Sequence, residues 1–229
     1  MAVRTAFALG LHRVRDTSTI FDKDQIIVRQ NLWRSLFVLD RFLAASLGRP
    51  TAISEEDCAE DSLIPPEAMM KGLEGKVADG IGTTSLDAAV NTCQSIGHIL
   101  KKIYSKRKVT TGLAQSIAGD CEPWMIRLHT EFDAKRLFYG AVCPGEAVAI
   151  LHVHLLGCHS IILLTRPFFL YLLIRSRGNT QGGGEARDRS QSRLERFGEA
   201  CIAAAIRTIS LVNAAFESDV VPQRNPFIL

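Results

Sequence analysis

A short run of histidine and cysteine residues is the nearest approach to a chemical motif in this chain. His152 and His154 form a His-x-His pair, and Cys158 follows His154 by four residues. Residues four apart share one face of a helix and could hold one metal ion, whereas residues two apart point to different faces. No acidic residue or further cysteine stands close by. We therefore interpret these side chains as core or helix-interface residues rather than metal ligands.

Signatures of catalysis are missing from the sequence. It has no Gly-x-Ser-x-Gly nucleophile motif, no phosphate-binding loop and no Gly-x-Gly-x-x-Gly. The closest two of the six cysteines stand 15 residues apart, which excludes a zinc site built from local cysteine pairs. We expect free, mostly buried thiols in a reducing compartment, no cofactor in this chain and no enzyme activity.

Positive charge gathers near the end of one predicted helix, at Lys101, Lys102, Lys106, Arg107 and Lys108. Such a run is a candidate nuclear localisation signal or nucleic-acid patch. Cations at a helix C-terminus also complement the helix dipole, and we favour this second interpretation. The net charge of +3 is too small for the whole surface to bind nucleic acid.

One apolar segment is long enough to cross a membrane. Residues 147–165 are 19 residues without Asp, Glu, Lys or Arg. The segment carries three histidines, however, and Arg166-Pro167 follows it directly. Polar groups are costly in lipid, so we favour a buried core helix. A membrane-associated helical protein with a spanning segment at 147–165 stays the alternative.

The elements that must position these residues are helices. Hydrophobic residues make up 47% of the chain and charged residues 22%, a balance typical of a globular protein with a sizeable core. Helical periodicity dominates and strand-like alternation is scarce. The sequence therefore predicts an all-α, irregular domain of about six or seven helices. We expect them at 2–12, 22–47, 67–80, 85–108, 113–139 with a weakness at Pro123, 146–165 and 193–216, and a flexible loop at 178–192.

The helix over 22–47 has the clearest start and stop signals. Asp22 and Gln25 have the spacing of a capping box. Gly48 suits the position just after the helix, and Pro50 prevents its continuation. The leucines of this helix repeat at helical spacing and predict one apolar face. The residues that we expect to be largely buried are Trp33, Leu36, Phe37, Leu39 and Leu43.

Proline also stands at the end of the apolar segment. Pro167 lacks an N–H and its ring collides with the preceding turn, so it is expected to bend or end the helix over 146–165.

Several short motifs occur together in one order along the chain. They are Leu9-Gly-Leu-His-Arg13, Leu32-Trp33, Ser35-Leu-Phe-Val-Leu-Asp40-Arg41, Ser46-Leu-Gly-Arg-Pro50, Ile53 with Asp57-Cys58, Thr165-Arg166-Pro167-Phe168 and Ala200-Cys201. This combination resembles the central regulatory domain, or middle homology region, of fungal zinc binuclear cluster transcription factors. The block over 9–58 carries most of the resemblance. Arg34 departs from it, because the family has a second tryptophan there.

Physically, these motif residues suit a scaffold. Gly48 permits the helix to end, Pro50 directs the exit, and Trp33 anchors the core. Asp40, Arg41 and Arg49 are candidates for a buried ion-pair network that holds helices in register. The full set of candidate structural residues is Trp33, Asp40, Arg41, Gly48, Arg49, Pro50, Arg166 and Pro167.

The resemblance implies a regulatory domain that controls RNA polymerase II transcription in the nucleus. Members of the family bind DNA through an N-terminal cluster that holds two zinc ions, and this chain has no such cluster. We therefore expect residues 1–229 to be part of a regulatory domain truncated at both ends. The partners implied are DNA through the missing module, a second copy, other transcription proteins or a small-molecule effector.

Overall fold

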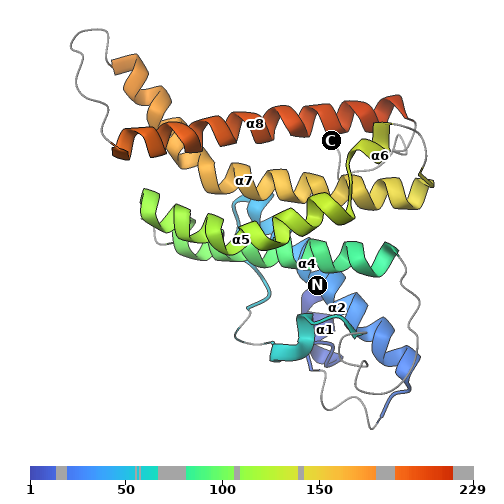
Figure 1. The fold of residues 1–229 in the computed structure, drawn as a ribbon. Coiled ribbons are helices and arrows are strands. Elements are labelled where there is room, and N and C mark those ends of the chain that lie inside the picture. Colours follow the sequence, from blue (N-terminus) through green and yellow to red (C-terminus); the bar gives the residue numbers. More distant parts are fainter. Residues whose placement is uncertain are drawn as a thin grey trace. The chain divides into compact units, whose positions relative to one another are not determined.

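A computed structural model of the chain describes residues 1–13, 20–54, 56, 58–66, 81–105, 109–138, 142–178 and 189–218. Within these ranges the chain forms seven α-helices and no strand, which confirms the all-α prediction (Figure 1). The chain divides into two compact units, Met1–Gly97 and His98–Leu229.

The first unit contains α1 (Ala2–Ala8), α2 (Lys23–Leu47), the short 3₁₀ turn η2 (Glu60–Leu63) and most of α4 (Ile81–Ile99). The capping box predicted for α2 is present. The backbone N–H of Gln25 donates to Asp22 Oδ1 at 2.8 Å, and the N–H of Asp22 donates to Gln25 Oε1 at 3.3 Å. At the other end Gly48 has φ of +63°, a left-handed conformation that glycine adopts without steric cost.

The face of α2 that is buried differs from the predicted one. Trp33 and Phe37 are fully buried as expected, but Leu39 and Leu43 are exposed and Leu36 is only half-buried. The buried positions instead include Arg34 and Arg41. Burial of a charged side chain is costly unless it is paired, and both arginines have partners, described below. The prediction of the buried face from the leucine pattern was therefore wrong, because ion pairs make the burial of Arg34 and Arg41 possible on another face of α2.

The second unit contains a π-helical turn η3 (Leu100–Tyr104), α5 (Thr111–Glu131), α6 (Lys135–Phe138), α7 (Pro144–Gly178) and α8 (Arg189–Glu217). The helix expected over 113–139 is divided into α5 and α6, and the division falls after Glu131 rather than at Pro123. α5 continues through Pro123. A proline removes one backbone hydrogen bond, and here this loss does not end the helix.

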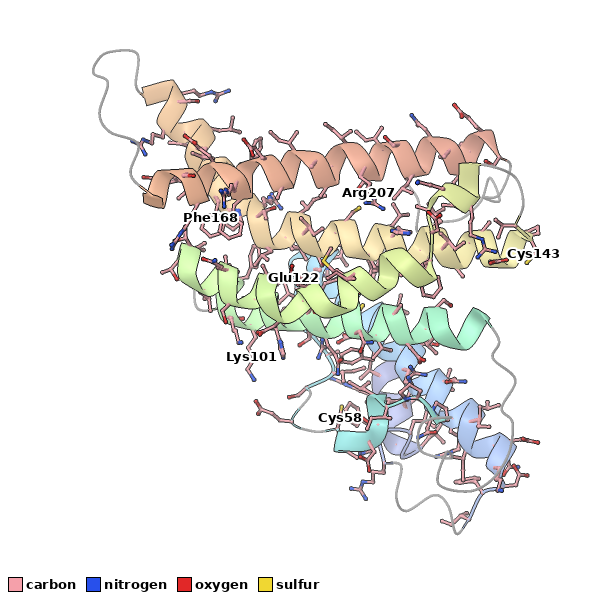
Figure 2. The ribbon with its side chains drawn as sticks, viewed as in Figure 1. Cys58, Lys101, Glu122, Cys143, Phe168 and Arg207 are labelled. Atoms are coloured by element: carbon pink, nitrogen blue, oxygen red, sulfur yellow. The ribbon has the colours of Figure 1, made fainter. Side chains whose placement is uncertain are left out.

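Helices α7 and α8 run side by side and supply most of the core of the second unit (Figure 1). Where they cross, the rings of Phe168 and Phe197 stack with their centroids 4.7 Å apart. Figure 2 shows Phe168 at this crossing. The next residue on α8 is Gly198, where an added Cβ would lie 2.8 Å from Leu172 Cδ1. The two helices can therefore approach closely because residue 198 has no side chain.

Pro167 lies inside α7, which continues to Gly178 instead of ending near residue 165. The helix changes direction along its length, as Figure 1 shows, so the bend that we expected is present and the end is not. In a regular helix residue 167 would donate its N–H to the carbonyl of Leu163. The hydroxyl of Tyr104 donates to this carbonyl at 2.9 Å. A side chain thus replaces the hydrogen bond that proline removes, and the helix can continue.

Some predicted features lie outside the described residues. These are the helix over 67–80, the basic residues Lys106, Arg107 and Lys108, and most of the loop over 178–192. The two ends of that loop region are helical, since Gly178 closes α7 and α8 begins at Arg189.

Two helices are long and apolar enough to cross a membrane by length and composition, within Pro144–Arg177 and Ser192–Glu217. The core helix of a soluble protein passes the same test, so the observation is weak. The predicted span 147–165 falls in the N-terminal part of α7, where Ile150, Val153 and Leu156 are fully buried. No observation favours the membrane alternative.

Candidate functional site

The motif residues of α2 meet the chain that follows the helix. Asp40 accepts two backbone N–H groups, from Ala52 at 2.9 Å and from Ile53 at 3.1 Å. The guanidinium of Arg41 donates to Asp40 Oδ2 at 2.8 Å and to the carbonyl of Ile53 at 2.9 Å. Asp40 and Arg41 therefore hold residues 52 and 53 from both sides. We call these two side chains with Ala52 and Ile53 the Asp40–Arg41 clamp.

The turn after α2 delivers the chain to this clamp. Gly48 takes the left-handed conformation, and the N–H of Arg49 donates to the carbonyl of Ala44 at 3.1 Å. Pro50 has a fixed φ and no backbone N–H, which disfavours continuation of the helix through it. Ile53, which follows this turn, is fully buried. The spacing between the Asp-Arg pair and the Gly-Arg-Pro turn thus has a geometric reason. The chain must reverse within a few residues after α2 so that residues 52 and 53 return to Asp40 and Arg41.

Arg49 does not take part as predicted. Its side chain is exposed, and its backbone N–H contributes a hydrogen bond to the turn. The buried ion pair therefore consists of Asp40 and Arg41, with Arg41 also placed 4.4 Å from the centre of the Phe37 ring. This position allows a cation–π contact in addition to the ion pair.

Trp33 joins the first motif of the chain to α2. Its ring lies 5.4 Å from Phe7 in an edge-on arrangement and 6.0 Å from His12. Gly10 turns the chain between these two residues with φ of +67°. A side chain of α2 also reaches this segment, since Arg29 donates to the carbonyl of Leu9 at 2.6 Å. Residues far apart in the sequence motif are thus brought together around Trp33.

Arg34 is a residue whose role sequence reasoning missed. It is fully buried, forms an ion pair with Asp87 of α4, and donates to Asn31 Oδ1 at 3.3 Å. The signal was available, because Arg34 stands seven residues before Arg41 and so lies on the same side of α2. This ion pair holds α4 against α2. Arg34 occupies the position where the family has a second tryptophan.

Cys93 of α4 completes this part of the core. Its thiol is fully buried and lies 3.8 Å from the carbonyl of Val38. Burial raises the pKa of Cys93 to about 12, although the positive charge of Arg41 acts in the opposite direction. A thiol with such a pKa stays protonated and is a poor nucleophile or metal ligand at neutral pH.

The second group of motif residues, Arg166 and Pro167, lies on α7 in the second unit. Arg166 is exposed. Desolvation raises the pKa of the Tyr104 hydroxyl, and the positive charge of Arg166 partly offsets this rise. The structure thus brings the Tyr104 hydroxyl to the Leu163 carbonyl beside Pro167, and Arg166 acts on Tyr104 through its charge.

The remaining candidates for chemistry do not form a metal-binding cluster in the part of the chain that the structure describes. His154 is buried, with its Nε2 2.6 Å from the carbonyl of Phe132, whereas His152 on the neighbouring face is exposed. Among the basic residues Lys101, labelled in Figure 2, is exposed. Lys102 is half-buried, and both residues lie on η3. The burial of His154 agrees with the core role that we favoured, whereas the exposure of His152 does not.

The zinc cluster that the resemblance implies does not fit the residues present. The six cysteines are free thiols, and four of them are buried at separate positions of the core. In the part of the chain that the structure describes, no three His, Cys, Asp or Glu side chains converge to hold a metal ion. Among the motif residues, Trp33, Asp40 and Arg41 form packing and hydrogen-bond contacts.

Comparison with known proteins agrees with this arrangement. Residues 1–136 match the family described as the fungal specific transcription factor domain. This match covers more than half of the chain and includes α1, α2, the Asp40–Arg41 clamp and α4. The chain belongs to this family.

Relatives of the chain are transcriptional regulators of fungi. An uncharacterized transcriptional regulatory protein of Schizosaccharomyces pombe is 24% identical over 93% of this chain and 25% of its own length. Filamentous growth regulator 27 of Candida albicans is 25% identical over 74% of this chain and 22% of its own length. Activator of stress genes 1 of Saccharomyces cerevisiae is 25% identical over 75% of this chain and 18% of its own length. The chain thus spans about a quarter or less of these relatives. No solved structure is significantly similar to it.

Proposed function

We propose that this chain acts as a regulatory domain of a fungal RNA polymerase II transcription factor, in the nucleus, and has no catalytic role. The observation that carries the proposal is the family match over residues 1–136. The residues that make the motif recognisable are used for packing, at Trp33 and at the Asp40–Arg41 clamp.

In this proposal DNA is read by another module of the same factor. Recognition of a particular DNA sequence requires a protein segment that enters a groove of the duplex and contacts the edges of the bases. The family places this task on a zinc cluster, and the cysteines of this chain are arranged otherwise. The regulatory domain would then control how the factor acts after DNA binding. Its partners would be other transcription proteins, a second copy or a small-molecule effector.

A reporter assay in yeast tests the proposal. The chain is fused to an unrelated DNA-binding domain, and transcription from a promoter with the matching sites is measured. We expect the fusion to change transcription severalfold relative to the DNA-binding domain alone. A variant with Asp40→Ala opens the Asp40–Arg41 clamp and is expected to remove this effect. The matched control is Asp24→Ala, an exposed acidic residue in the first turn of the same helix.

Both fusions must accumulate to equal levels in the nucleus for the comparison to hold. A reporter that responds equally to the fusion, to Asp40→Ala and to the DNA-binding domain alone would contradict a regulatory role for this domain.

A further inference from the structure

The outward side of α8 carries an apolar stripe. Ile202, Ile206, Ile209 and Phe216 are exposed by 48%, 59%, 62% and 53%. The inward side of the same helix is built from other residues, among them Cys201, Ala204, Leu211 and Ala215, which pack in the second unit. The exposed stripe is therefore additional to the face that holds α8 on α7. We call Ile202, Ile206, Ile209, Asn213 and Phe216 the α8 seam.

The spacing of the α8 seam is that of a coiled coil. Its members follow one another at intervals of four, three, four and three residues. This heptad repeat places side chains on a narrow stripe that suits packing against one further helix. Three of the five positions are isoleucine, whose stiff side chain packs well in such an interface. The pattern thus points to a helical occupant rather than to a small molecule.

Charges at the two ends of the seam are complementary when two copies of α8 run antiparallel. Exposed Arg196 stands near the start of the helix, and exposed Glu217 is its last residue. With Ile206 of one copy opposite Ile209 of the other, Arg196 of each copy lies beside Glu217 of the second copy. The two residues are about 30 Å apart within one helix, so they can meet only between copies.

The parallel arrangement is less favourable. Glu199 continues the heptad one step before Ile202, and it is exposed. A parallel pair would place Glu199 of one copy directly against Glu199 of the other, and like charges in contact are destabilising. In the antiparallel pair Glu199 faces Phe216 of the second copy, where its methylene groups can cover the ring and its carboxylate can reach water.

We propose that the α8 seam is a homodimer interface, with two copies of this chain pairing through α8 in antiparallel orientation. The isoleucines form the centre of the interface, and the two Arg196–Glu217 pairs lie at its ends. This proposal does not depend on the regulatory role described above.

The test uses the full chain and sedimentation velocity over about a hundredfold range of concentration. We expect the native chain to dimerise, and Ile206→Glu to raise the dissociation constant at least tenfold, because it places like charges near the centre of the interface. The matched control is Ile174→Glu, an exposed isoleucine on α7 outside the seam, which should dimerise as the native chain does. Far-UV circular dichroism checks that each variant is folded.

Charge exchange then tests the orientation. Arg196→Glu and Glu217→Arg should each weaken the dimer, and the double variant should restore it, because the pair is re-formed with reversed signs. A native chain that stays monomeric would overturn the proposal, as would a dimer unaffected by Ile206→Glu. A dimer that responds to Ile206→Glu but is not restored by the double exchange would overturn the antiparallel arrangement. Sedimentation of the native chain with phosphatidylcholine vesicles, with release by Ile206→Glu, would assign the seam to lipid instead.

Discussion

The hydrogen bond between Tyr104 and Leu163 gives a sharp test of how α7 tolerates proline. Pro167 cannot donate to the carbonyl of Leu163, and the hydroxyl of Tyr104 donates to it at 2.9 Å. Tyr104→Phe removes only this hydroxyl. A buried carbonyl without a partner costs about 1–3 kcal/mol, but Tyr104 is 39% exposed, so water can partly replace the bond. We expect Tyr104→Phe to lower the free energy of unfolding by about 1 kcal/mol.

A second substitution isolates this bond from other effects of the tyrosine. In the Pro167→Ala background the alanine N–H can donate to Leu163, as in a regular helix. Tyr104→Phe should then cost close to nothing. The coupling between the two positions in a double-mutant cycle is therefore expected to be about 1 kcal/mol. Pro167→Ala alone should stabilise the chain, since proline inside a helix is less favourable than alanine by up to ~3 kcal/mol.

The assay is urea unfolding of all four proteins, followed by far-UV circular dichroism. Equal slopes of the transitions are needed for the four free energies to be compared. If Tyr104→Phe costs the same with proline and with alanine at position 167, the hydroxyl does not replace the missing helix bond, and our account of the continuous helix is wrong.

Four further outcomes are expected. Asp40→Ala should lower the free energy of unfolding by about 3 kcal/mol, because it leaves the N–H groups of residues 52 and 53 and a buried guanidinium without their carboxylate; urea unfolding measures this. Cys93 should react with iodoacetamide at pH ~8 far more slowly than exposed Cys143, since a pKa of about 12 leaves about a thousandfold less thiolate than an ordinary thiol; mass spectrometry of the labelled sites decides it. Burial lowers the pKa of His159 below its ordinary 6.5, so the unfolded chain takes up a proton at a higher pH than the folded chain does. The stability contributed by neutral His159 is therefore full above pH ~6.5 and falls as the pH drops through this value towards the folded pKa. Urea midpoints measured at pH ~8 and ~5.5 should show this loss. The purified chain should bind DNA weakly, without sequence preference and less at high salt, through the basic run that begins at Lys101, as fluorescence anisotropy with two unrelated duplexes can test.

Each of these outcomes has a control. Asp24→Ala should leave the free energy of unfolding nearly unchanged, since Asp24 is exposed. Equal labelling of both cysteines in the folded chain would contradict the burial of Cys93. His159→Gln should reduce the loss of stability at low pH, and an unchanged pH profile would assign that loss to other groups. Tight binding to one duplex, competed only by its own sequence, would refute the absence of sequence readout.

Local features of the fold could be predicted from the sequence because their causes are local. The start of α2 depends on Asp22 and Gln25, three residues apart, and its end depends on Gly48. Each of these devices acts through hydrogen bonds or steric limits within one turn of the chain. The family could be recognised for a related reason, because its motif residues are closely spaced and occur in a set order.

The inward face of α2 was decided by tertiary structure. A stripe of leucines predicted one face, and the fold buries another that includes Arg34 and Arg41. The partners that make this burial tolerable are Asp87, which lies 53 residues from Arg34, and the backbone of Ile53. Sequence periodicity reports the apolar character of a face, and it does not report whether a charged side chain will meet a partner from a distant segment.

The course of α7 was decided in the same way. The presence of Pro167 in the sequence predicts a disturbance, since the loss of the N–H and the clash with the preceding turn are properties of proline itself. Whether that disturbance ends the helix or bends it depends on what reaches the unpaired carbonyl of Leu163. The answer is a hydroxyl from Tyr104, 59 residues earlier, placed by a π-helical turn. The sequence determined where the helix is weak, and the tertiary contact determined that it continues, because only folding brings the two residues within hydrogen-bond distance.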